Sequence, residues 1–412
     1  MNTLSSQDIM LAAALIFGLA TLCQVVAPLL RVPALILLLP VGFIFGLIAP
    51  QLQADKILGP AFPVIVDLMV AVILFQGGMQ LGAIPLAKSD KAVVRRLVWI
   101  GGAITCAGAT LAAHFILGLA WPLAFLLGAI LIVSGPTVVT PILDFARPTP
   151  RVRGILLWEG TALDPLGAIF AVVVFQLIQA SNNSTGPIEA IGTFAASLVI
   201  AILVATGGVL LIVAGSKITG GKGMLGTQIL IGAVLVAAGF ANFLAEESGL
   251  LTALLMGIAA PRLATKLNTS IEPAQPFFNT IASIGIGVLF ISIAAIVPSP
   301  IVEKMVLPAV AMALLLIVVV RPISTIVCTA KSSLSGHERA FIGWMDPRGI
   351  VAAATASSLG ATLVAAKVPG AEELLPAAFV IIAVTVFIYG LTAVPVAKML
   401  GVRDESSEEV SQ

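Results

Sequence analysis

Two carboxylates, Glu159 and Asp164, lie near the middle of residues 153–178, a stretch otherwise long and apolar enough to cross a membrane. A charged side chain at the centre of a bilayer costs roughly 2.5–3.5 kcal/mol on insertion scales, so it is retained where it meets a polar partner, an ion or water. Five residues on a helix correspond to about 140° of rotation and about 7.5 Å of rise. The two acids therefore point in different directions, and we expect Asp164 to bind ions while Glu159 supports the scaffold.

A second apolar stretch is broken at residues 134–141, Ser-Gly-Pro-Thr-Val-Val-Thr-Pro. Its prolines remove helix hydrogen bonds and free backbone carbonyls. At membrane depth such a backbone is tolerated where it is buried in protein or lines a cavity. Ser134, Thr137 and Thr140 add hydroxyl oxygens. An interrupted helix beside an intramembrane aspartate is the way in which secondary transporters build a cation site.

A third stretch is interrupted at residues 344–349, Trp-Met-Asp-Pro-Arg-Gly. The ends of half-helices carry partial charges, which Asp346 and Arg348 are placed to neutralise. A position of Arg348 near the cytoplasmic surface, as an ordinary basic residue, is the alternative.

Two further polar residues fall in apolar stretches, and each allows two interpretations. Arg321 either extends toward the membrane interface or pairs with a buried carboxylate, for which Glu159 is the natural candidate. Gln76 either forms a hydrogen bond between helices or is a ligand of an ion.

The composition indicates a polytopic integral membrane protein, because 59% of the 412 residues are hydrophobic and 10% are charged, against about 25% charged in soluble domains. Stretches of about 17–25 apolar residues are long enough to span a bilayer as helices. Thirteen windows approach or fit this description: 9–30, 32–50, 61–82, 96–118, 120–143, 154–179, 188–215, 226–244, 247–262, 275–298, 304–329, 338–365 and 374–399.

The basic residues give the orientation, because cytoplasmic loops are rich in lysine and arginine. With thirteen spans, sixteen of the 21 basic residues fall in one set of loops, whereas the opposite set holds Lys56, Lys304 and Lys367. We expect a multi-pass protein of the bacterial inner membrane with its N-terminus outside. The short acidic tail, 401–412, is then cytoplasmic, and we expect it to lack structure.

Other classes of protein have little support. No basic tract favours nucleic acid, the three cysteines lack metal-ligand spacing, and no soluble-enzyme motif is present, so we expect neither a cofactor nor an enzyme. A sodium-coupled symporter of an organic solute is the main alternative. An intramembrane hydrolase that pairs Asp164 with Asp346 is a more distant one.

The segments SGPTVVTPIL, WEGTALDPLGA, VVRPIST and WMDPRGIVAAA, in this order, resemble the monovalent cation/proton antiporter-1 family, the sodium/proton exchangers that include short bacterial members. The resemblance covers essentially all thirteen spans. It implies an all-α fold of two inverted six-helix repeats, in which the interrupted fifth and twelfth helices cross. It also implies that Asp164 binds ion and proton, and that Arg321 pairs with Glu159.

The chain departs from the family pattern at four places. The helix-five aspartate is replaced by Gly135, the asparagine before the essential aspartate by Leu163, the hydroxyl residue after the glutamate by Gly160, and the helix-three acid by Gln76. The site therefore has fewer oxygen ligands and less negative charge than is usual in the family.

We therefore expect one exchanger domain, 1–400, which exchanges a monovalent cation for H⁺ by competition at Asp164. Na⁺ is the first candidate, with Li⁺ and K⁺ as alternatives, and the family implies one-for-one exchange. Backbone oxygens near Ser134 and Thr137, with Thr161 or Gln76, would complete the site. Core helices near 120–179 and 304–365 would move against a scaffold that forms a homodimer in the bilayer.

Overall fold

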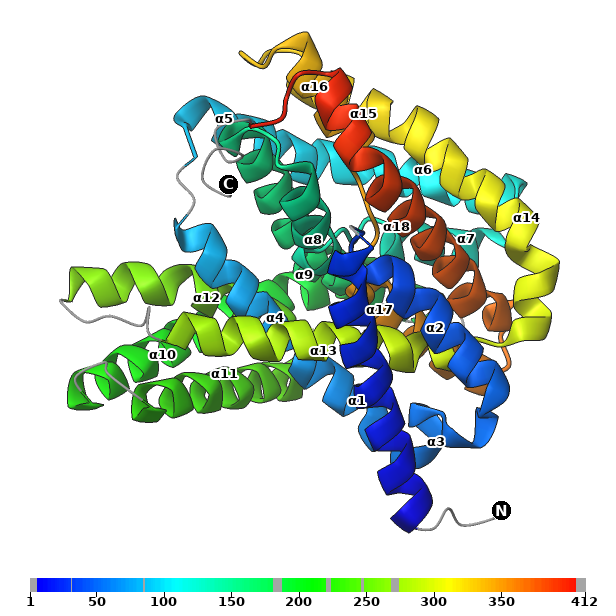
Figure 1. The fold of residues 1–412 in the computed structure, drawn as a ribbon, viewed down its shortest axis with the longest axis horizontal. Helices are drawn as coiled ribbons and strands as arrows, with labels where there is room; N and C mark the ends of the chain where they lie inside the picture. Colours follow the sequence, from blue (N-terminus) through cyan, green and yellow to red (C-terminus); the bar gives the residue numbers. More distant parts are fainter. Residues whose placement is uncertain are drawn as a thin grey trace. The chain divides into compact units, whose positions relative to one another are not determined.

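The computed structural model describes residues 6–30, 32–83, 86–180, 187–219, 224–245, 248–267 and 274–404. Apart from one bridge between Pro148 and Arg403, these residues form helices, turns and loops (Figure 1). The chain divides into two compact units, the first made of Met1–Ile57, Leu86–Asp164 and Phe290–Gln412, and the second of Leu58–Pro85 and Pro165–Leu289.

Two helices cross the boundary between the units, α9 (Pro150–Ala180) and α13 (Gln275–Ala295). The short helix α3 (Ala54–Leu58) ends at that boundary. The other helices of the first unit are α1 (Ser6–Leu29), α2 (Leu35–Ile48), η1 (Pro50–Leu52), α5 (Lys88–Arg96), η2 (Leu97–Gly101), α6 (Gly102–Phe115), α7 (Trp121–Ile130), α8 (Pro136–Ala146), α14 (Ser299–Leu315), η4 (Leu316–Val320), α15 (Arg321–Thr329), α16 (Gly336–Trp344), α17 (Ile350–Ala365), η5 (Ala371–Glu373) and α18 (Leu374–Met399). Those of the second unit are α4 (Ala61–Ala83), α10 (Pro187–Thr219), α11 (Met224–Leu244) and α12 (Ser248–Lys266).

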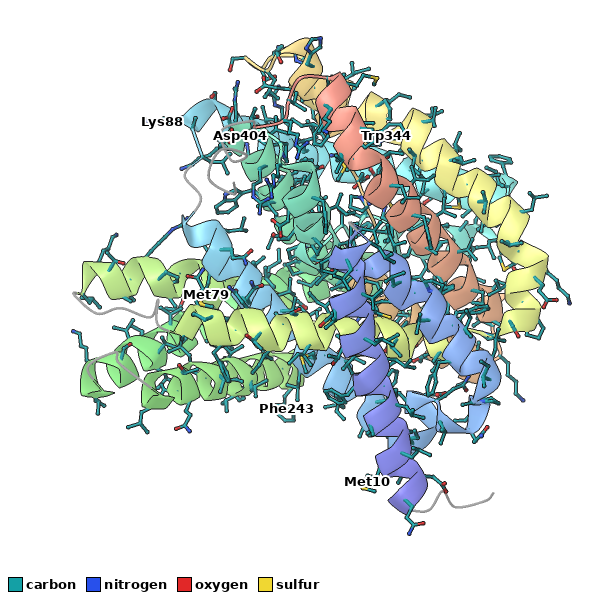
Figure 2. The ribbon with its side chains drawn as sticks, viewed as in Figure 1. Met10, Met79, Lys88, Phe243, Trp344 and Asp404 are labelled. Atoms are coloured by element: carbon teal, nitrogen blue, oxygen red, sulfur yellow. The ribbon has the colours of Figure 1, made fainter. Side chains whose placement is uncertain are left out.

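These helices match the thirteen predicted spans. Ten helical segments in the described part of the chain are long and apolar enough to cross a membrane. The shorter α2 and the two interrupted segments, α7–α8 and α16–α17, supply the remaining three. Large apolar side chains on the outer faces fit a lipid environment: Met10 on α1 is 70% exposed and Phe243 on α11 is 84% exposed (Figure 2). The protein is a multi-pass membrane protein.

The predicted bounds differ from the helices mainly where a helix continues into charged residues. The fourth span begins at Lys88 instead of 96, and α12, predicted to end at 262, extends to Lys266. Hydropathy finds only the apolar part of a helix, whereas the helix itself continues into the membrane interface.

The prediction of an unstructured tail is wrong for residues 401–404. The backbone N–H of Thr149 donates to the carbonyl of Val402, and that of Asp404 to the carbonyl of Arg147, both at 2.8 Å. The tail therefore begins by pairing with the loop before α9. Residues 405–412 lie outside the described part of the chain.

Within the second unit, α10, α11 and α12 lie side by side, and α12 also packs on α4 (Figure 1). A Cβ atom added to Gly78 of α4 would lie 2.7 Å from the carbonyl oxygen of Leu254, and one added to Gly257 of α12 would lie 2.2 Å from that of Phe75. Only glycine permits this approach, in the way that small residues bring helices together in membranes.

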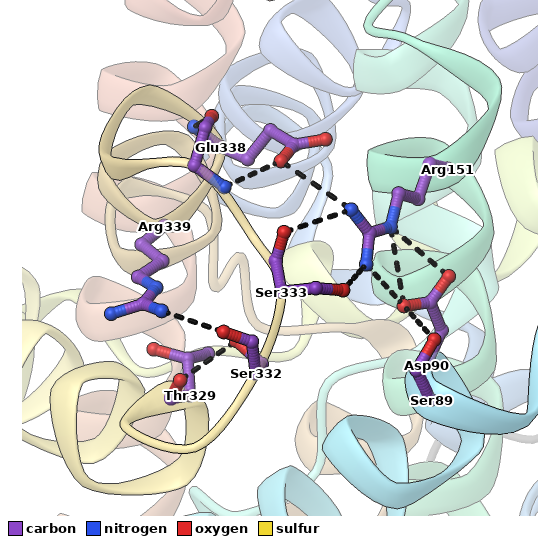
Figure 3. Close-up of polar contacts among 9 residues, drawn as sticks. Ser89, Asp90, Arg151, Thr329, Ser332, Ser333, Glu338 and Arg339 are labelled. Carbon is purple, nitrogen blue, oxygen red and sulfur yellow. Dashed lines mark hydrogen bonds and ion pairs between the residues drawn. The ribbon is translucent and has the colours of Figure 1, made fainter.

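A cluster of hydrogen bonds joins the starts of α5, α9 and α16 within the first unit (Figure 3). In this Arg151 cluster, the guanidinium of Arg151 donates from Nη2 to Asp90 Oδ1 at 2.7 Å and from Nε to Asp90 Oδ2 at 3.1 Å. It also donates from Nη2 to Ser333 Oγ at 2.7 Å. Glu338, which forms a capping box with Ser335 at the start of α16, lies 3.7 Å from Arg151. The cluster thus ties the helix that carries Asp164 to two segments distant in sequence.

Replacing Arg151 by Gln should lower the apparent melting temperature of the protein in detergent. The carboxylate of Asp90 is almost fully buried, and leaving such a group without its partner costs about 1–3 kcal/mol. The matched control is Arg153→Gln, two residues along the same helix, where the partner Asp144 is 57% exposed and the pair contributes little. Equal melting temperatures for the two variants would contradict this role of the cluster.

Candidate functional site

The two buried acids of α9, Glu159 and Asp164, both belong to the first unit, and Glu159 is held by an arginine. Arg321 donates from Nη1 to Glu159 Oε1 and from Nη2 to Glu159 Oε2, the latter at 2.9 Å. Its Nε donates to the carbonyl of Ile342 at 3.1 Å. Both charged side chains are almost fully buried. Of the two interpretations of Arg321, this bidentate pair agrees with the one in which it has a buried carboxylate partner.

A wide π-helical turn leads directly into Arg321. The turn, η4, ends at Val320, and the backbone N–H of Arg321 reaches back to the carbonyl of Leu316. The fourth span contains a second such turn, η2, and Cys328 of α15 donates its thiol to the carbonyl of Arg96 just before it, at 3.3 Å. Single π-turns are rare within α-helices, and those that do occur are often found at functional sites.

The two interrupted segments cross. Pro136 begins α8, a position that suits proline because the first helical N–H has no partner in the helix. Ser134, in the preceding break, donates its hydroxyl to the carbonyl of Pro347 in the break between α16 and α17, at 3.0 Å. A Cβ atom added to Gly349 would lie 3.3 Å from the backbone nitrogen of Gly135. The chains of the two breaks are therefore in contact.

The charges beside the second break neutralise each other. Nη2 of Arg348 donates to Asp346 Oδ2 at 2.7 Å, and Nη1 donates to the freed carbonyl of Ile132 at 3.4 Å. Arg348 is 2% exposed, so the alternative of a plain basic residue near the surface is wrong. The backbone N–H of Arg348 is bound by Thr385 of α18, whose hydroxyl accepts it at 3.3 Å and itself donates to the carbonyl of Ile382.

Asp164 has no such partner. It is fully buried, and neither carboxylate oxygen has a hydrogen bond within the described structure. The hydroxyl of Thr137, also buried, is likewise without a partner there. A Cβ atom added to Gly135 would lie 2.1 Å from Asp164 Oδ2, and one added to Gly349 would lie 3.4 Å from Thr137 Oγ1. Both polar groups thus border the crossing of the two breaks.

Carboxylate and hydroxyl oxygens are the donor types that hard monovalent and divalent cations prefer. Buried polar groups are nearly always hydrogen-bonded, and each exception calls for an explanation, of which a bound ion is one. The oxygens of Asp164 and Thr137 are therefore suited to hold a cation. The buried pair of Asp346 and Arg348 adds no net charge beside them.

The remaining predicted site residues lie in two places. Thr161 is buried on α9, one turn before Asp164. Gln76 belongs to the second unit, where its Nε2 donates to Asn279 Oδ1 at 2.8 Å. This hydrogen bond joins α4 to α13, as the simpler of the two interpretations of Gln76 expects.

Sequence reasoning did not find Thr385 or the close contact of Gly135 with Asp164. Thr385 is one of three hydroxyl residues in its span, with Tyr389 and Thr392, and no sequence signal separates it from other threonines. Thr392, seven residues further along α18, accepts a hydrogen bond from Trp344 Nε1 at 3.0 Å, while the rings of Tyr389 and Trp344 pack in a T-shaped arrangement. One face of α18 thus supports the second break.

Comparison with known proteins shows the family of the chain. The sequence matches the family described as sodium/hydrogen exchanger, transmembrane, over residues 12–399. It is 25% identical over 377 residues to Na(+)/H(+) antiporter 1 of Methanocaldococcus jannaschii, with 87% of this chain and 85% of the relative covered. It is 24% identical over 411 residues to the K(+)/H(+) antiporter NhaP2 of Shewanella sp. strain ANA-3, with 97% of this chain and 68% of the relative covered.

The fold has a close counterpart among solved structures. The structure of the sodium proton antiporter MjNhaP1 from M. jannaschii at pH 8 superposes with a TM-score of 0.79 at 22% sequence identity, over 96% of this chain and 100% of that one. The match confirms the predicted fold class, and the family match spans nearly the whole chain. The protein therefore belongs to the sodium/hydrogen exchanger family of cation/proton antiporters.

Proposed function

We propose that the protein exchanges a monovalent cation for H⁺, and that Asp164 binds the two in turn. The observation that carries the proposal is the set of buried oxygens without partners, Asp164 Oδ1 and Oδ2 and Thr137 Oγ1, at the crossing of the two breaks. Removing a carboxylate from water favours its neutral, protonated form, whereas an adjacent cation favours the charged form. Release of the proton and binding of the cation are then one event, and competition for one carboxylate couples the two fluxes.

The other buried charges around the breaks support exchange of one cation for one proton. Glu159 is paired with Arg321, and Asp346 with Arg348. Each pair has no net charge, so Asp164 alone changes its charge as the cargo changes. The pairing of Asp346 with Arg348 also argues against a hydrolase, because a second acid that is tied to a guanidinium is not free to share a proton with Asp164.

We take Na⁺ as the first candidate for the cargo, with Li⁺ and K⁺ to be tested beside it. The two relatives are named for different cations: the M. jannaschii protein is a Na⁺/H⁺ antiporter and the Shewanella protein is a K⁺/H⁺ antiporter. Backbone oxygens of the first break and the hydroxyl of Thr161 would add ligands. Gln76, which belongs to the second unit, is the remaining candidate ligand.

We further propose alternating access, in which the interrupted helices move with α9 and α15. All the proposed ligands except Gln76 lie within the first unit, which supports their moving together. The family resemblance supports a homodimer. The distribution of basic residues supports a place in the bacterial inner membrane, with the N-terminus outside and the C-terminus in the cytoplasm.

The first test is cation-dependent proton flux in proteoliposomes. A preset pH gradient should be dissipated when Na⁺, Li⁺ or K⁺ is added to vesicles with the wild-type protein, and should persist with Asp164→Asn, because an amide neither releases a proton nor balances the charge of a cation. Asp144→Asn, which changes an exposed acid, is the matched control and should be active. If the wild type responds to no cation over a range of pH, the proposal fails and a sodium-coupled solute symporter becomes the better hypothesis.

The second test separates the role of Glu159 from that of Asp164. Glu159→Ala leaves the buried guanidinium of Arg321 without its carboxylate, and breaking a buried pair costs about 3–5 kcal/mol. We expect low expression and a lower melting temperature. The exchanged pair Glu159→Arg with Arg321→Glu should recover part of the stability, but not all of it, because the hydrogen bond to Ile342 is lost.

Asp164→Asn should retain the wild-type melting temperature, since the carboxylate that it replaces has no hydrogen-bond partner in the described structure. If Glu159→Ala were as stable as Asp164→Asn and equally inactive, both acids would have to be assigned to transport. The proposed division of roles would then be incorrect.

A further inference from the structure

Gly135 lies directly beneath the carboxylate of Asp164. A Cβ atom at position 135 would lie 2.1 Å from Oδ2 and 2.5 Å from both Cγ and Oδ1 of Asp164. All three atoms of the carboxyl group therefore occupy the place that a side chain at residue 135 would fill. Asp164 is fully buried, so its side chain has little room into which to withdraw.

The backbone does not require glycine at this position. Gly135 has φ −100° and ψ 161°, an extended conformation that any residue adopts. Gly349, across the crossing, has φ −111° and ψ −178°, and a Cβ atom there would meet its nearest neighbours at 3.3–3.4 Å. What distinguishes Gly135 is the space that the carboxylate takes.

We propose that Gly135 is a positioning residue that lets Asp164 rest on the interrupted backbone, and that it thereby selects among monovalent cations by size. This inference rests on the proposed exchange at Asp164. A methyl group at residue 135 would push the carboxylate away from the break and take up volume beside it. Less room would then remain for a cation beside the carboxylate, so that a small cation would be affected less than a large one.

The test compares Gly135→Ala with the matched control Gly360→Ala in proteoliposomes. A Cβ atom added to Gly360, in α17, would meet its nearest atoms at 3.7–3.9 Å, which is ordinary contact. For Gly135→Ala we expect the KM for K⁺ to rise about tenfold or more, since small misplacements of a reacting group have effects of this size. The KM should rise less for Na⁺ and least for Li⁺, with a much smaller change in maximal rate. Gly360→Ala should match the wild type.

Two transport results would overturn the inference. One is an unchanged KM and an unchanged order of cations in a well-folded Gly135→Ala protein. The other is an equal loss with all three cations, seen only in the maximal rate, as expected for a purely structural role. If the wild type itself exchanged no cation, the proposed function would fail instead, and the two failures are thereby distinguished.

A stability measurement covers the case in which Gly135→Ala folds poorly. Asp164→Ala removes the three atoms that meet the added methyl group. We expect Gly135→Ala to lower the melting temperature in the wild-type background and to have little effect in the Asp164→Ala background, while Gly360→Ala behaves alike in both. An equal loss in both backgrounds would show that the methyl group meets something other than the carboxylate, and would overturn the inference.

Discussion

The structure around the site depends on the cost of an uncompensated charge away from water. Removing one partner of a buried ion pair is strongly destabilising, and the first unit meets this constraint with closed pairs. Glu159 and Asp346 are each held by a guanidinium, and those guanidinium groups also bind freed carbonyls, Arg321 that of Ile342 and Arg348 that of Ile132. The arginines thus satisfy both the acids and the broken helices.

Close approach of backbones is the second requirement. Two interrupted segments can share hydrogen bonds only if their chains touch, and a Cβ atom added to Gly349 would lie 3.3 Å from the backbone nitrogen of Gly135. Ser134 then bonds to the carbonyl of Pro347, and Thr385 binds the N–H of Arg348. Several backbone groups near the breaks are thus bound by side chains from other segments of the first unit, which helps to hold the two breaks in contact.

The sequence was sufficient to predict the features that depend on a single stretch of chain. Hydropathy located the spans, proline and glycine located the breaks, and Asp164 was prominent because an acid within an apolar helix is rare. The bidentate contact of Arg321 with Glu159 came from a family resemblance, since 162 residues separate the two and composition says nothing about such a pair.

What could not be predicted depends on which side chains meet after folding. Arg151 and Asp90 fall outside the predicted apolar windows, in stretches that hydropathy describes only as basic and polar, and Thr385 is one hydroxyl among many. The sequence showed Gly135 only as the place where the family has an aspartate. The structure shows that the carboxyl group of Asp164 occupies the space that a side chain at residue 135 would fill. The unstructured tail was an incorrect prediction for a similar reason: Val402 and Asp404 pair with a loop more than 250 residues earlier in the chain.

These constraints together determine what the first unit can do. The buried pairs Glu159–Arg321 and Asp346–Arg348 form a frame that is already neutral. Binding an ion to either pair, or leaving an uncompensated charge beside them, would therefore cost free energy. Asp164 differs because its oxygens have no partner in the described structure, so a proton or a cation is the least costly way to neutralise it. Since either one restores neutrality, the loaded forms are electrically alike, whereas the empty form carries a buried charge. Under the proposed exchange, such a frame would favour movement of the loaded forms and oppose movement of the empty form, which is the condition for obligatory exchange.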